Sequence, residues 1–417
     1  MQYGLIGKPL GHSMSPKIHA LLGNNDYELL ELEESELKSF LEKREFKGIN
    51  VTIPYKEKVL QYLDVIDDNA KRIGCVNTIV NINGVLHGYN TDYDGFKELI
   101  ISSNIELKDK NVLILGSGGT SKTAITVLKD LGVSNIKIVS RTSSENKITY
   151  EDALKESATN IIVNTTPVGM YPNTAKYPLT VHKFNNLEAV VDVIYNPLNS
   201  RLLCFARKRR VKAVGGLKML VSQAIKAHEL FFNSKVENNV RKEVYNKIYK
   251  EKVNIVLIGM PGCGKSTIAK YLAKELNREL IDLDKEIEKS ENKLIKDIFA
   301  ESGEDYFRDV ESNITKKFAK LHGQVISCGG GIIKNSKNIE MLRQNGLIIF
   351  VNRSVHLLEA LKSDKRPLAK SRDDLEKLYQ ERKHLYFRSA DKIFKNNGLF
   401  LECAKLVKEW FDEVDGY

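Results

Sequence analysis

The sequence predicts an α/β protein with two nucleotide-binding domains, because a strand, a glycine-rich turn and a helix follow one another at two places. One such unit reads NVLILGSGGTSKTAITVL at 111–128, and the other reads VNIVLIGMPGCGKST at 253–267. The length of 417 residues also exceeds what a single core accommodates. A phosphate-binding turn follows the first strand of its own domain, so the long segment before residue 253 must fold separately.

The composition is that of a globular protein with anionic partners. Hydrophobic residues make up 42% of the chain and charged residues 28%, and the formal net charge is +10. No apolar run is long enough to span a bilayer, and the N-terminus lacks the pattern of a signal peptide, so we expect a cytoplasmic protein without membrane contact. The lysines are spread along the helices without an RNA-binding aromatic signature, which favours small anionic ligands over nucleic acid. The oligomeric state stays open.

The five cysteines are scattered, with no C-x-x-C and no histidine pair at zinc spacing. We therefore expect free thiols and neither a disulfide framework nor a zinc site. The residues concerned are Cys75, Cys204, Cys263, Cys328 and Cys403.

The chain opens with a predicted strand, 3–6, and a proline-bounded loop that carries Ser13 and Ser15. Small hydroxyl groups on a stiff loop suit hydrogen bonding to a polar ligand. Ser15, which precedes a proline, could instead cap a helix at 17–22.

A β-branched strand at 49–53 ends at Pro54 and places Lys56 at the mouth of a predicted helix. The helix dipole opposes a positive charge there and should lower the pKa of Lys56, which favours proton exchange near neutral pH. The alternative is a solvated surface lysine. Further on, the segments 74–80 and 84–96 should bring a group of polar residues to strand ends, namely Asn77, Asn90, Thr91 and Asp92.

The first glycine turn has the pattern of a dinucleotide-binding turn, with three glycines at Gly116, Gly118 and Gly119. The next predicted strand, 136–139, ends where such a fold contacts the ribose, at Ser140, Arg141 and Thr142. No acidic residue stands there to accept a 2′-hydroxyl, whereas Arg141 would pair with a 2′-phosphate. The sequence therefore predicts NADP rather than NAD, unless Arg141 is only a solvated loop charge.

The second turn fills the G-x-x-x-x-G-K-[ST] template directly after a strand. Its glycines can direct backbone N–H groups toward a triphosphate, Lys265 can neutralise phosphate oxygens, and the Ser266 hydroxyl can bind Mg²⁺. The turn thus predicts ATP and Mg²⁺ as ligands, with contacts from Gly259, Gly262, Gly264, Lys265, Ser266 and Thr267.

Two carboxylates follow at Asp282 and Asp284 on a predicted strand, where alternation would point them the same way. One could hold Mg²⁺ through water while the other accepts a hydrogen bond or a proton from a substrate hydroxyl. A solvated acidic turn is the alternative.

The remaining part of the second half holds the components of an anion pocket. Arg308 and Arg382 can bind a carboxylate with paired N–H donors, the triple glycine at 329–331 permits close backbone approach, and Arg366 on a proline-stiffened lid can reach a transferring phosphoryl group.

The first half resembles shikimate dehydrogenase in its GKPLGHSMSP, NVTIPYK and GYNTD motifs, and the resemblance continues through NTTPVGM, DVIYNP and GGLKMLVSQA. This resemblance implies that Lys56 and Asp92 are the catalytic pair. It implies substrate contacts by Ser13, Ser15, Thr52, Asn77, Tyr195 and Gln223, and nicotinamide contacts by Gly215 and Met219.

The second half resembles shikimate kinase in its phosphate loop and in the motifs D-x-D, F-R-x-x-E, G-G-G, R-P-L and R-x-x-x-Y. This resemblance implies catalysis by Lys265, Asp284 and Arg366, and metal contacts by Ser266 and Asp282. Shikimate would be held by Asp284, Arg308, Gly330 and Arg382.

These resemblances imply three domains. The substrate domain would comprise 1–92 and 215–250, with a helix at 218–233 returning to it; a Rossmann domain would comprise 93–214, and a P-loop kinase domain 251–417. The expected activities are NADPH-dependent reduction of 3-dehydroshikimate and ATP-dependent phosphorylation of shikimate. The alternative is a dehydrogenase that prefers quinate and NAD, fused to a nucleotide-sensing or nucleic-acid-binding module without kinase activity.

Overall fold

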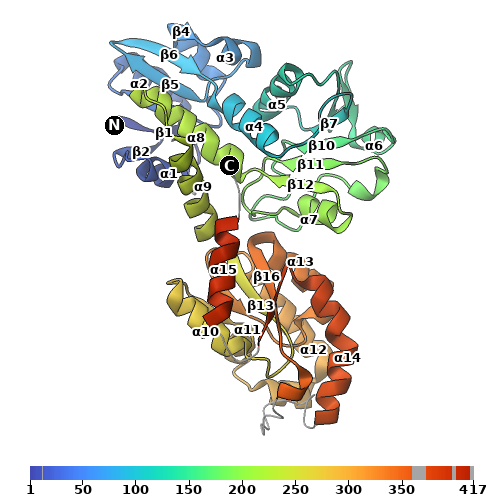
Figure 1. Cartoon of the computed structure of the whole chain (residues 1–417). Coiled ribbons are helices and arrows are strands. Elements are labelled where there is room, and N and C mark those ends of the chain that lie inside the picture. The colour runs from blue at the N-terminus through green and yellow to red at the C-terminus, as the bar shows by residue number, and fades with distance from the viewer. Residues whose placement is uncertain (12, 359–371, 397–400, 414–417) are drawn as a thin grey trace. The chain divides into compact units, whose positions relative to one another are not determined.

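A computed structural model of the whole chain describes residues 1–11, 13–358, 372–396 and 401–413 (Figure 1). The described residues form two compact units. The first contains residues 1–196 and 200–248, and the second contains residues 197–199 and 249–413. Each unit has its own sheets and its own core.

The first sheet lies at the start of the first unit and has the strand order β2-β1-β3-β5-β6-β4. Its first three strands in sequence run parallel, whereas β5 pairs with β3 in antiparallel fashion. The strands are β1 (Tyr3–Gly7), β2 (Tyr27–Glu31), β3 (Gly48–Val51), β4 (Val65–Ile66), β5 (Thr78–Ile82) and β6 (Val85–Tyr89). The helices of this part are α1 (Ser15–Leu21), α2 (Glu34–Lys43) and α3 (Asp68–Ile73).

The second sheet of the same unit is parallel throughout and has the order β12-β11-β10-β7-β8-β9. Its strands are β7 (Asn111–Leu115), β8 (Asn135–Ser140), β9 (Lys147–Thr149), β10 (Ile161–Asn164), β11 (Ala189–Asp192) and β12 (Lys212–Gly215). The order in which the strands are added reverses between β7 and β10: β8 and β9 follow β7 toward one edge, and β11 and β12 follow β10 toward the other. Doubly wound sheets bind ligands at such a point, at the carboxyl ends of the strands. Its helices are α4 (Thr91–Ser102), α5 (Gly119–Asp130), α6 (Tyr150–Ala153) and α7 (Arg201–Lys208).

Helix α8 (Leu217–Phe232) leaves the second sheet and packs on the first, as the sequence predicts for 218–233. A Cβ on Gly48 of β3 would collide with the ring of Phe231, so the glycine permits this close approach. Helices α8 and α4 also touch closely, since a Cβ on Gly95 would lie 2.6 Å from the carbonyl oxygen of Met219. Helix α9 (Asn238–Lys252) follows.

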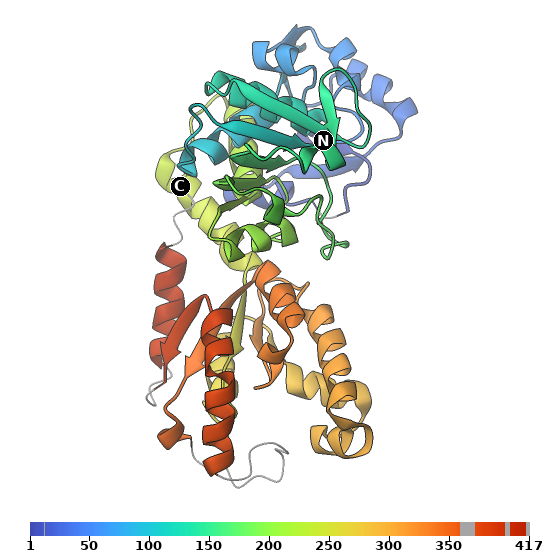
Figure 2. The same ribbon diagram turned by 90° about the vertical axis from the view of Figure 1, so that its right-hand side faces the viewer.

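The second unit is built on one parallel sheet with the order β14-β15-β13-β16-β17, and helices lie on both of its faces (Figure 2). The strands are β13 (Asn254–Ile258), β14 (Leu280–Asp282), β15 (Val325–Ser327), β16 (Gly346–Asn352) and β17 (Lys392–Lys395). The helices are α10 (Lys265–Glu275), α11 (Leu283–Glu291), α12 (Ile295–Phe318), α13 (Ser336–Asn345), α14 (Arg372–Ser389) and α15 (Leu401–Glu413). The second glycine turn therefore leaves the carboxyl end of the central strand.

All five cysteines are buried free thiols. In the part of the chain that the structure describes, no helix is both long and apolar enough to cross a membrane.

A fully buried histidine on α1 packs against the first sheet. The ring of His19 stacks on Tyr27 with centroids 4.1 Å apart. Burial, with a smaller contribution from His228, lowers the pKa of His19 to about 3. An unfolded chain binds a proton at His19 below about pH 6.5, whereas the folded chain does not until about pH 3.

We therefore expect the stability that neutral His19 contributes to be complete above pH 6.5 and to be lost as the pH falls toward 3. The variant His19→Phe keeps an aromatic ring against Tyr27 and should lose less stability than the wild type between pH 7 and about pH 5. Urea unfolding at both pH values measures the difference. The exposed His182→Phe variant is the matched control, and an equal pH response in all three proteins would contradict this assignment.

Candidate functional sites

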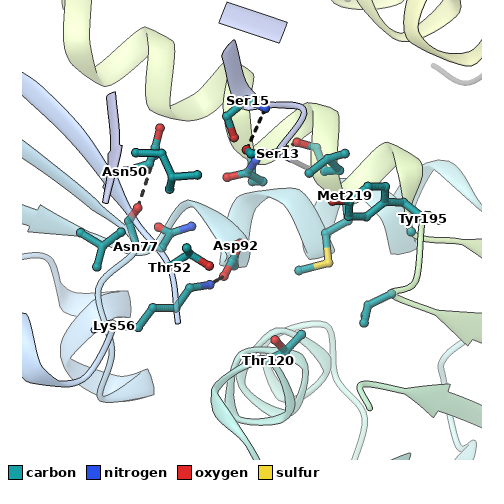
Figure 3. Close-up of a pocket in the computed structure, with 16 residues that line it drawn as sticks. Ser13, Ser15, Asn50, Thr52, Lys56, Asn77, Asp92, Thr120, Tyr195 and Met219 are labelled. Carbon is teal, nitrogen blue, oxygen red and sulfur yellow. Dashed lines mark hydrogen bonds and ion pairs between the residues drawn. The ribbon is translucent and has the colours of Figure 1, made fainter. Parts of the chain in front are cut away.

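The first unit contains a cavity of 260 Å³ between its two sheets (Figure 3). It brings together nine of the residues predicted for catalysis, substrate or cofactor, namely Ser13, Ser15, Thr52, Lys56, Asn77, Asp92, Tyr195, Met219 and Gln223. Seven further residues that had no predicted role there complete the lining, namely Leu5, Asn50, Val51, Thr120, Val193, Gly216 and Leu220.

Lys56 and Asp92 point toward one another in this cavity, and Lys56 Nζ lies 2.6 Å from Asp92 Oδ2 (Figure 3). Lys56 lies in the turn after β3, and the short 3-10 helix that follows begins only at Lys58. Burial opposes the charge on Lys56, but the carboxylate of Asp92 outweighs it and raises the pKa of the Lys56 ammonium above its usual value. The prediction of a helix dipole that lowers this pKa is therefore wrong. The pair holds a proton ready for delivery.

Asp92 and Asn77 reach the cavity from different elements. Strand β6 ends at Tyr89 and Asp92 lies in the first turn of α4, so the predicted strand end is in fact a helix start. The backbone N–H of Thr91 donates to Asn77 Oδ1 at 2.7 Å, and the Thr91 hydroxyl donates to the same oxygen at 3.2 Å. The oxygen of the Asn77 amide is thus held by protein, which leaves its Nδ2 to donate to a ligand.

The two serines lie at the start of α1. The N-cap residue of this helix is Met14, and Ser15 is already inside the first turn, so the alternative that Ser15 caps the helix is wrong. The backbone N–H of Ser15 donates to Ser13 Oγ at 3.2 Å, which fixes the loop. Both serines line the cavity.

The opposite wall of the cavity comes from the end of β11 and the start of α8. Burial raises the pKa of the Tyr195 hydroxyl, which therefore stays protonated and able to donate. Met219 is buried on α8. Gly215 ends β12 without lining the cavity, whereas its neighbour Gly216 does. A Cβ on Gly216 would collide with the backbone of Val193, so these two segments are in direct contact.

The first glycine turn lies next to this cavity at the carboxyl end of β7. Gly116 has φ of +106°, and a Cβ there would lie 2.9 Å from Thr165 Oγ1. Gly118 precedes α5 and Gly119 is its first residue, so the helix N-terminus faces the turn. Such a turn and helix start suit the pyrophosphate of a dinucleotide.

The predicted ribose contacts lie at the carboxyl end of the neighbouring strand β8. Ser140 is its last residue and donates a hydrogen bond to the carbonyl oxygen of Thr142. Arg141 is exposed between them. A cationic side chain at this position fits a 2′-phosphate.

The second glycine turn, in the second unit, wraps around Lys265. Gly264 has φ of +95°, and a Cβ there would lie 2.7 Å from Asn396 Nδ2. The Lys265 ammonium donates to the carbonyl oxygens of Gly259 and Met260 at 2.9 and 3.0 Å. Gly262, at φ of +81°, belongs to the same turn. Ser266 and Thr267 are exposed in the first turn of α10, where their hydroxyls are available to a ligand.

The two carboxylates near β14 do not alternate along one strand, so that prediction is wrong. Asp282 ends β14 and caps α11 by accepting from the backbone N–H of Lys285 at 3.4 Å, while Asp284 lies inside the first turn of that helix. A Cβ on Gly329 would lie 2.5 Å from Asp284 Oδ1, so this carboxylate reaches the triple glycine. Asp282 and Ser266 lie at the same edge of the sheet, and a carboxylate with a hydroxyl is a donor set that suits Mg²⁺.

Arg308 reaches the triple glycine from α12. A Cβ on Gly331 would collide with its guanidinium group. Glu311 accepts from Arg308 Nη1 at 2.9 Å and Glu304 accepts from Nη2 at 3.0 Å. Burial raises the pKa of Glu311, although Arg308 opposes this effect. The two glutamates fix the direction of the guanidinium group.

Arg382 approaches the same glycines from α14. Its Nη1 donates to the carbonyl oxygen of Gly330 at 3.2 Å, and the hydroxyl of Tyr386 donates to the same oxygen at 2.5 Å. The Nε of Arg382 is buried and has no hydrogen-bond partner among the described residues. The predicted phosphoryl contact, Arg366, lies outside the described residues.

Some residues of both sites were not predicted. Asn50, in the lining of the first cavity, accepts from the Tyr27 hydroxyl at 2.6 Å and donates to Thr78 Oγ1 at 2.9 Å. Asn396 donates to the carbonyl oxygen of Cys263 at 2.7 Å in the phosphate loop. For Glu311 a signal existed, since its spacing of three from Arg308 on a helix puts the two side chains on one face. Asn396 gives no such signal, because 133 residues separate it from Cys263.

Fold and sites together define a dinucleotide-binding dehydrogenase unit followed by a P-loop kinase unit. Residues 5–79 match the family model of the shikimate dehydrogenase substrate binding domain, and residues 261–411 match that of shikimate kinase. The chain belongs to the shikimate dehydrogenase family and carries a shikimate kinase domain in addition.

Two relatives and one solved structure are similar to the dehydrogenase unit. A shikimate dehydrogenase (NADP(+)) of Clostridium beijerinckii is 41% identical over 58% of this chain and 96% of its own length. That of Clostridium perfringens is 35% identical over 59% of this chain and 97% of its own. The shikimate 5-dehydrogenase of Thermus thermophilus, solved in complex with NADP(H) and shikimate, is 31% identical with a TM-score of 0.54 over 59% of this chain and 99% of its own.

Proposed function

We propose that the chain catalyses two consecutive reactions of aromatic amino-acid biosynthesis. The first unit reduces 3-dehydroshikimate to shikimate with NADPH, and the second phosphorylates shikimate to shikimate 3-phosphate with ATP. The observation that carries the proposal is the partly buried Lys56–Asp92 pair inside a polar cavity, in a chain whose other unit matches shikimate kinase. Positive net charge suits substrates that all bear carboxylate or phosphate groups.

In the first reaction the residues of the cavity bind the substrate and supply a proton. NADPH, when bound, provides the hydride. Lys56 donates its proton to the oxygen that becomes the new hydroxyl, and Asp92 holds and orients the ammonium group. Asn77 donates from Nδ2 to a substrate oxygen because its own oxygen is already occupied. Ser13 and Ser15 bind a further polar group of the ring acid, and Thr52, Tyr195 and Gln223 complete the set.

In the second reaction the triple glycine is the centre of the substrate site. Arg308 and Arg382 bind the carboxylate of shikimate, and Asp284 accepts a hydrogen bond and then the proton of the reacting hydroxyl. Lys265 neutralises charge on the phosphate oxygens, and we propose the same role for Arg366. Ser266 and Asp282 would hold Mg²⁺, which would add to this neutralisation.

Arg141 is proposed to select NADPH over NADH. The Arg141→Ala variant should raise KM for NADPH about tenfold or more, because a charge-assisted hydrogen bond to the 2′-phosphate is lost. KM for NADH should change little. Steady-state kinetics with both nucleotides measure the ratio, and Lys137→Ala, an exposed cation on the same strand, is the control. A parallel change for both nucleotides would contradict the assignment.

The combined activity is tested by supplying 3-dehydroshikimate, NADPH and ATP with Mg²⁺ to the purified chain. Shikimate 3-phosphate should form only when all of them are present, and shikimate should accumulate when ATP is omitted. Oxidation of quinate in preference to shikimate, or the absence of shikimate-dependent ADP release, would contradict the proposal. We also propose a cytoplasmic location, with which the five free cysteines are consistent.

A further inference from the structure

A buried carboxylate that the reaction does not use lies between the nucleotide turn and the substrate cavity. Asp192 is the last residue of β11 and is fully buried. Its Oδ1 accepts from Asn164 Nδ2 at 3.0 Å and from the backbone N–H of Ile194 at 3.1 Å, and its Oδ2 accepts from the Ser200 hydroxyl at 2.5 Å. Among the described residues, every hydrogen-bond donor to Asp192 is uncharged.

On one side, hydrogen bonds connect this carboxylate to the nucleotide turn. Asn164 ends β10, and its own Oδ1 accepts from the backbone N–H and the hydroxyl of Thr166 at 3.1 and 2.7 Å. Thr165 is tied to the end of β7, because its hydroxyl donates to the carbonyl oxygen of Leu115 at 2.7 Å. A Cβ on Gly116 would lie 2.9 Å from Thr165 and 3.0 Å from Thr166, so this loop forms one wall of the glycine turn.

On the other side it leads to the substrate cavity. The bond to Ile194 fixes the chain between Val193 and Tyr195, and both of these residues line the cavity. The carbonyl oxygen of Ile194 in turn accepts from the backbone N–H of Gly216 at 3.0 Å, at the start of α8. One carboxylate oxygen therefore holds the loop that faces the nucleotide and the loop that faces the substrate.

We propose that Asp192 is a positioning residue, which sets the nucleotide-side loop (Asn164–Thr166) and the substrate-side loop (Val193–Tyr195) at the separation that hydride transfer needs. The inference rests on the proposed dehydrogenase function. Burial raises the pKa of Asp192 to about 6, and a carboxyl group kept in such an unfavourable environment is more typical of functional regions than of ordinary core. A displacement of the two loops by about 1 Å is enough to slow a reaction by about 10²-fold.

Three single variants separate this role from simple stability. Asp192→Ala removes both links, and Asn164→Ala breaks the same connection from the nucleotide side. Asp192→Asn keeps an oxygen for Asn164 and Ile194, and its new amide can donate to the Ser200 hydroxyl. Ser200→Ala is the matched control, because it removes a buried bond to Asp192 and the cap of α7 but leaves the connection between the loops intact.

The measurement is kcat for NADPH-dependent reduction of 3-dehydroshikimate per active site. The active sites are counted by NADP⁺ titration, so that a loss of folded protein does not lower the measured kcat. Asp192→Ala and Asn164→Ala should each lower this kcat by about 10²-fold. The double variant should be about as slow as either single one, because both act on one connection. Asp192→Asn and Ser200→Ala should stay close to the wild type.

Wild-type kcat per site in either alanine variant, additive losses in the double variant, or an Asp192→Asn enzyme as slow as Asp192→Ala would overturn the proposal. If Asp192→Ala does not fold, Asn164→Ala and Asp192→Asn decide alone. A wild-type chain that does not reduce 3-dehydroshikimate would instead refute the proposed function, and this inference with it.

Discussion

Replacing Lys56 by methionine is expected to lower kcat for reduction of 3-dehydroshikimate by about 10³-fold, within the range that a positioned general acid contributes. The methionine side chain fills similar space but carries no proton. Substrate binding should change much less, because the hydroxyl and amide groups of the cavity remain. Shikimate phosphorylation should be unaffected, since the residues of that site belong to the second unit.

The variant Asp92→Asn tests the same pair through its pH dependence. In the reduction Lys56 acts as an acid, so the rate falls as the pH rises through its pKa. Asp92 raises that pKa while burial lowers it. Without the carboxylate the effect of burial is no longer outweighed, and the alkaline loss of kcat should move to lower pH than in the wild type.

Lys58→Met is the matched control, because Lys58 lies two residues further along and pairs with Glu34 outside the cavity. Its kinetics should resemble those of the wild type. A near-normal kcat in Lys56→Met would show that Lys56 is not the proton donor. Equal loss of both activities in a folded protein would show that the two active sites are not independent.

Local patterns predicted most of what positions these sites. Both glycine turns follow the strands that the sequence indicates, because a turn with positive φ needs glycine at particular positions and leaves a visible spacing. Helix α8 was also predictable, since its apolar residues recur with helical period. The errors arise where two local signals compete. Asp92 and Asp284 follow strand-like segments, but each lies in the first turn of a helix, where acidic residues are favoured by the helix dipole.

Long-range contacts were beyond prediction from one sequence. The pKa of Lys56 is decided by Asp92, 36 residues away, and not by its own segment. Tyr386 donates to Gly330 from 56 residues further along the chain. Asp192 looks like an ordinary strand end until β10 and β11 pair and bring Asn164 beside it. Such positions follow from sheet order, which no local spacing records.

Replacing Lys265 by methionine should lower kcat for shikimate phosphorylation by about 10²- to 10³-fold, the cost of removing one donor that stabilises charge in a transition state. Lys265 is buried in the second glycine turn, where it already donates to two carbonyl oxygens. The turn therefore places a cation next to the expected position of the phosphate oxygens of ATP. A neutral side chain there would stabilise the negative charge of the transition state less well.

ADP release that depends on shikimate measures this effect, and reduction of 3-dehydroshikimate by the same preparation confirms that the chain is folded. The exposed Lys270→Met variant on the same helix is the control for loss of charge alone. If Lys265→Met kept wild-type turnover, the second glycine turn would not be the phosphate site. If Lys270→Met lost as much activity as Lys265→Met, the general positive field of the helix, and not the geometry of the turn, would account for the rate.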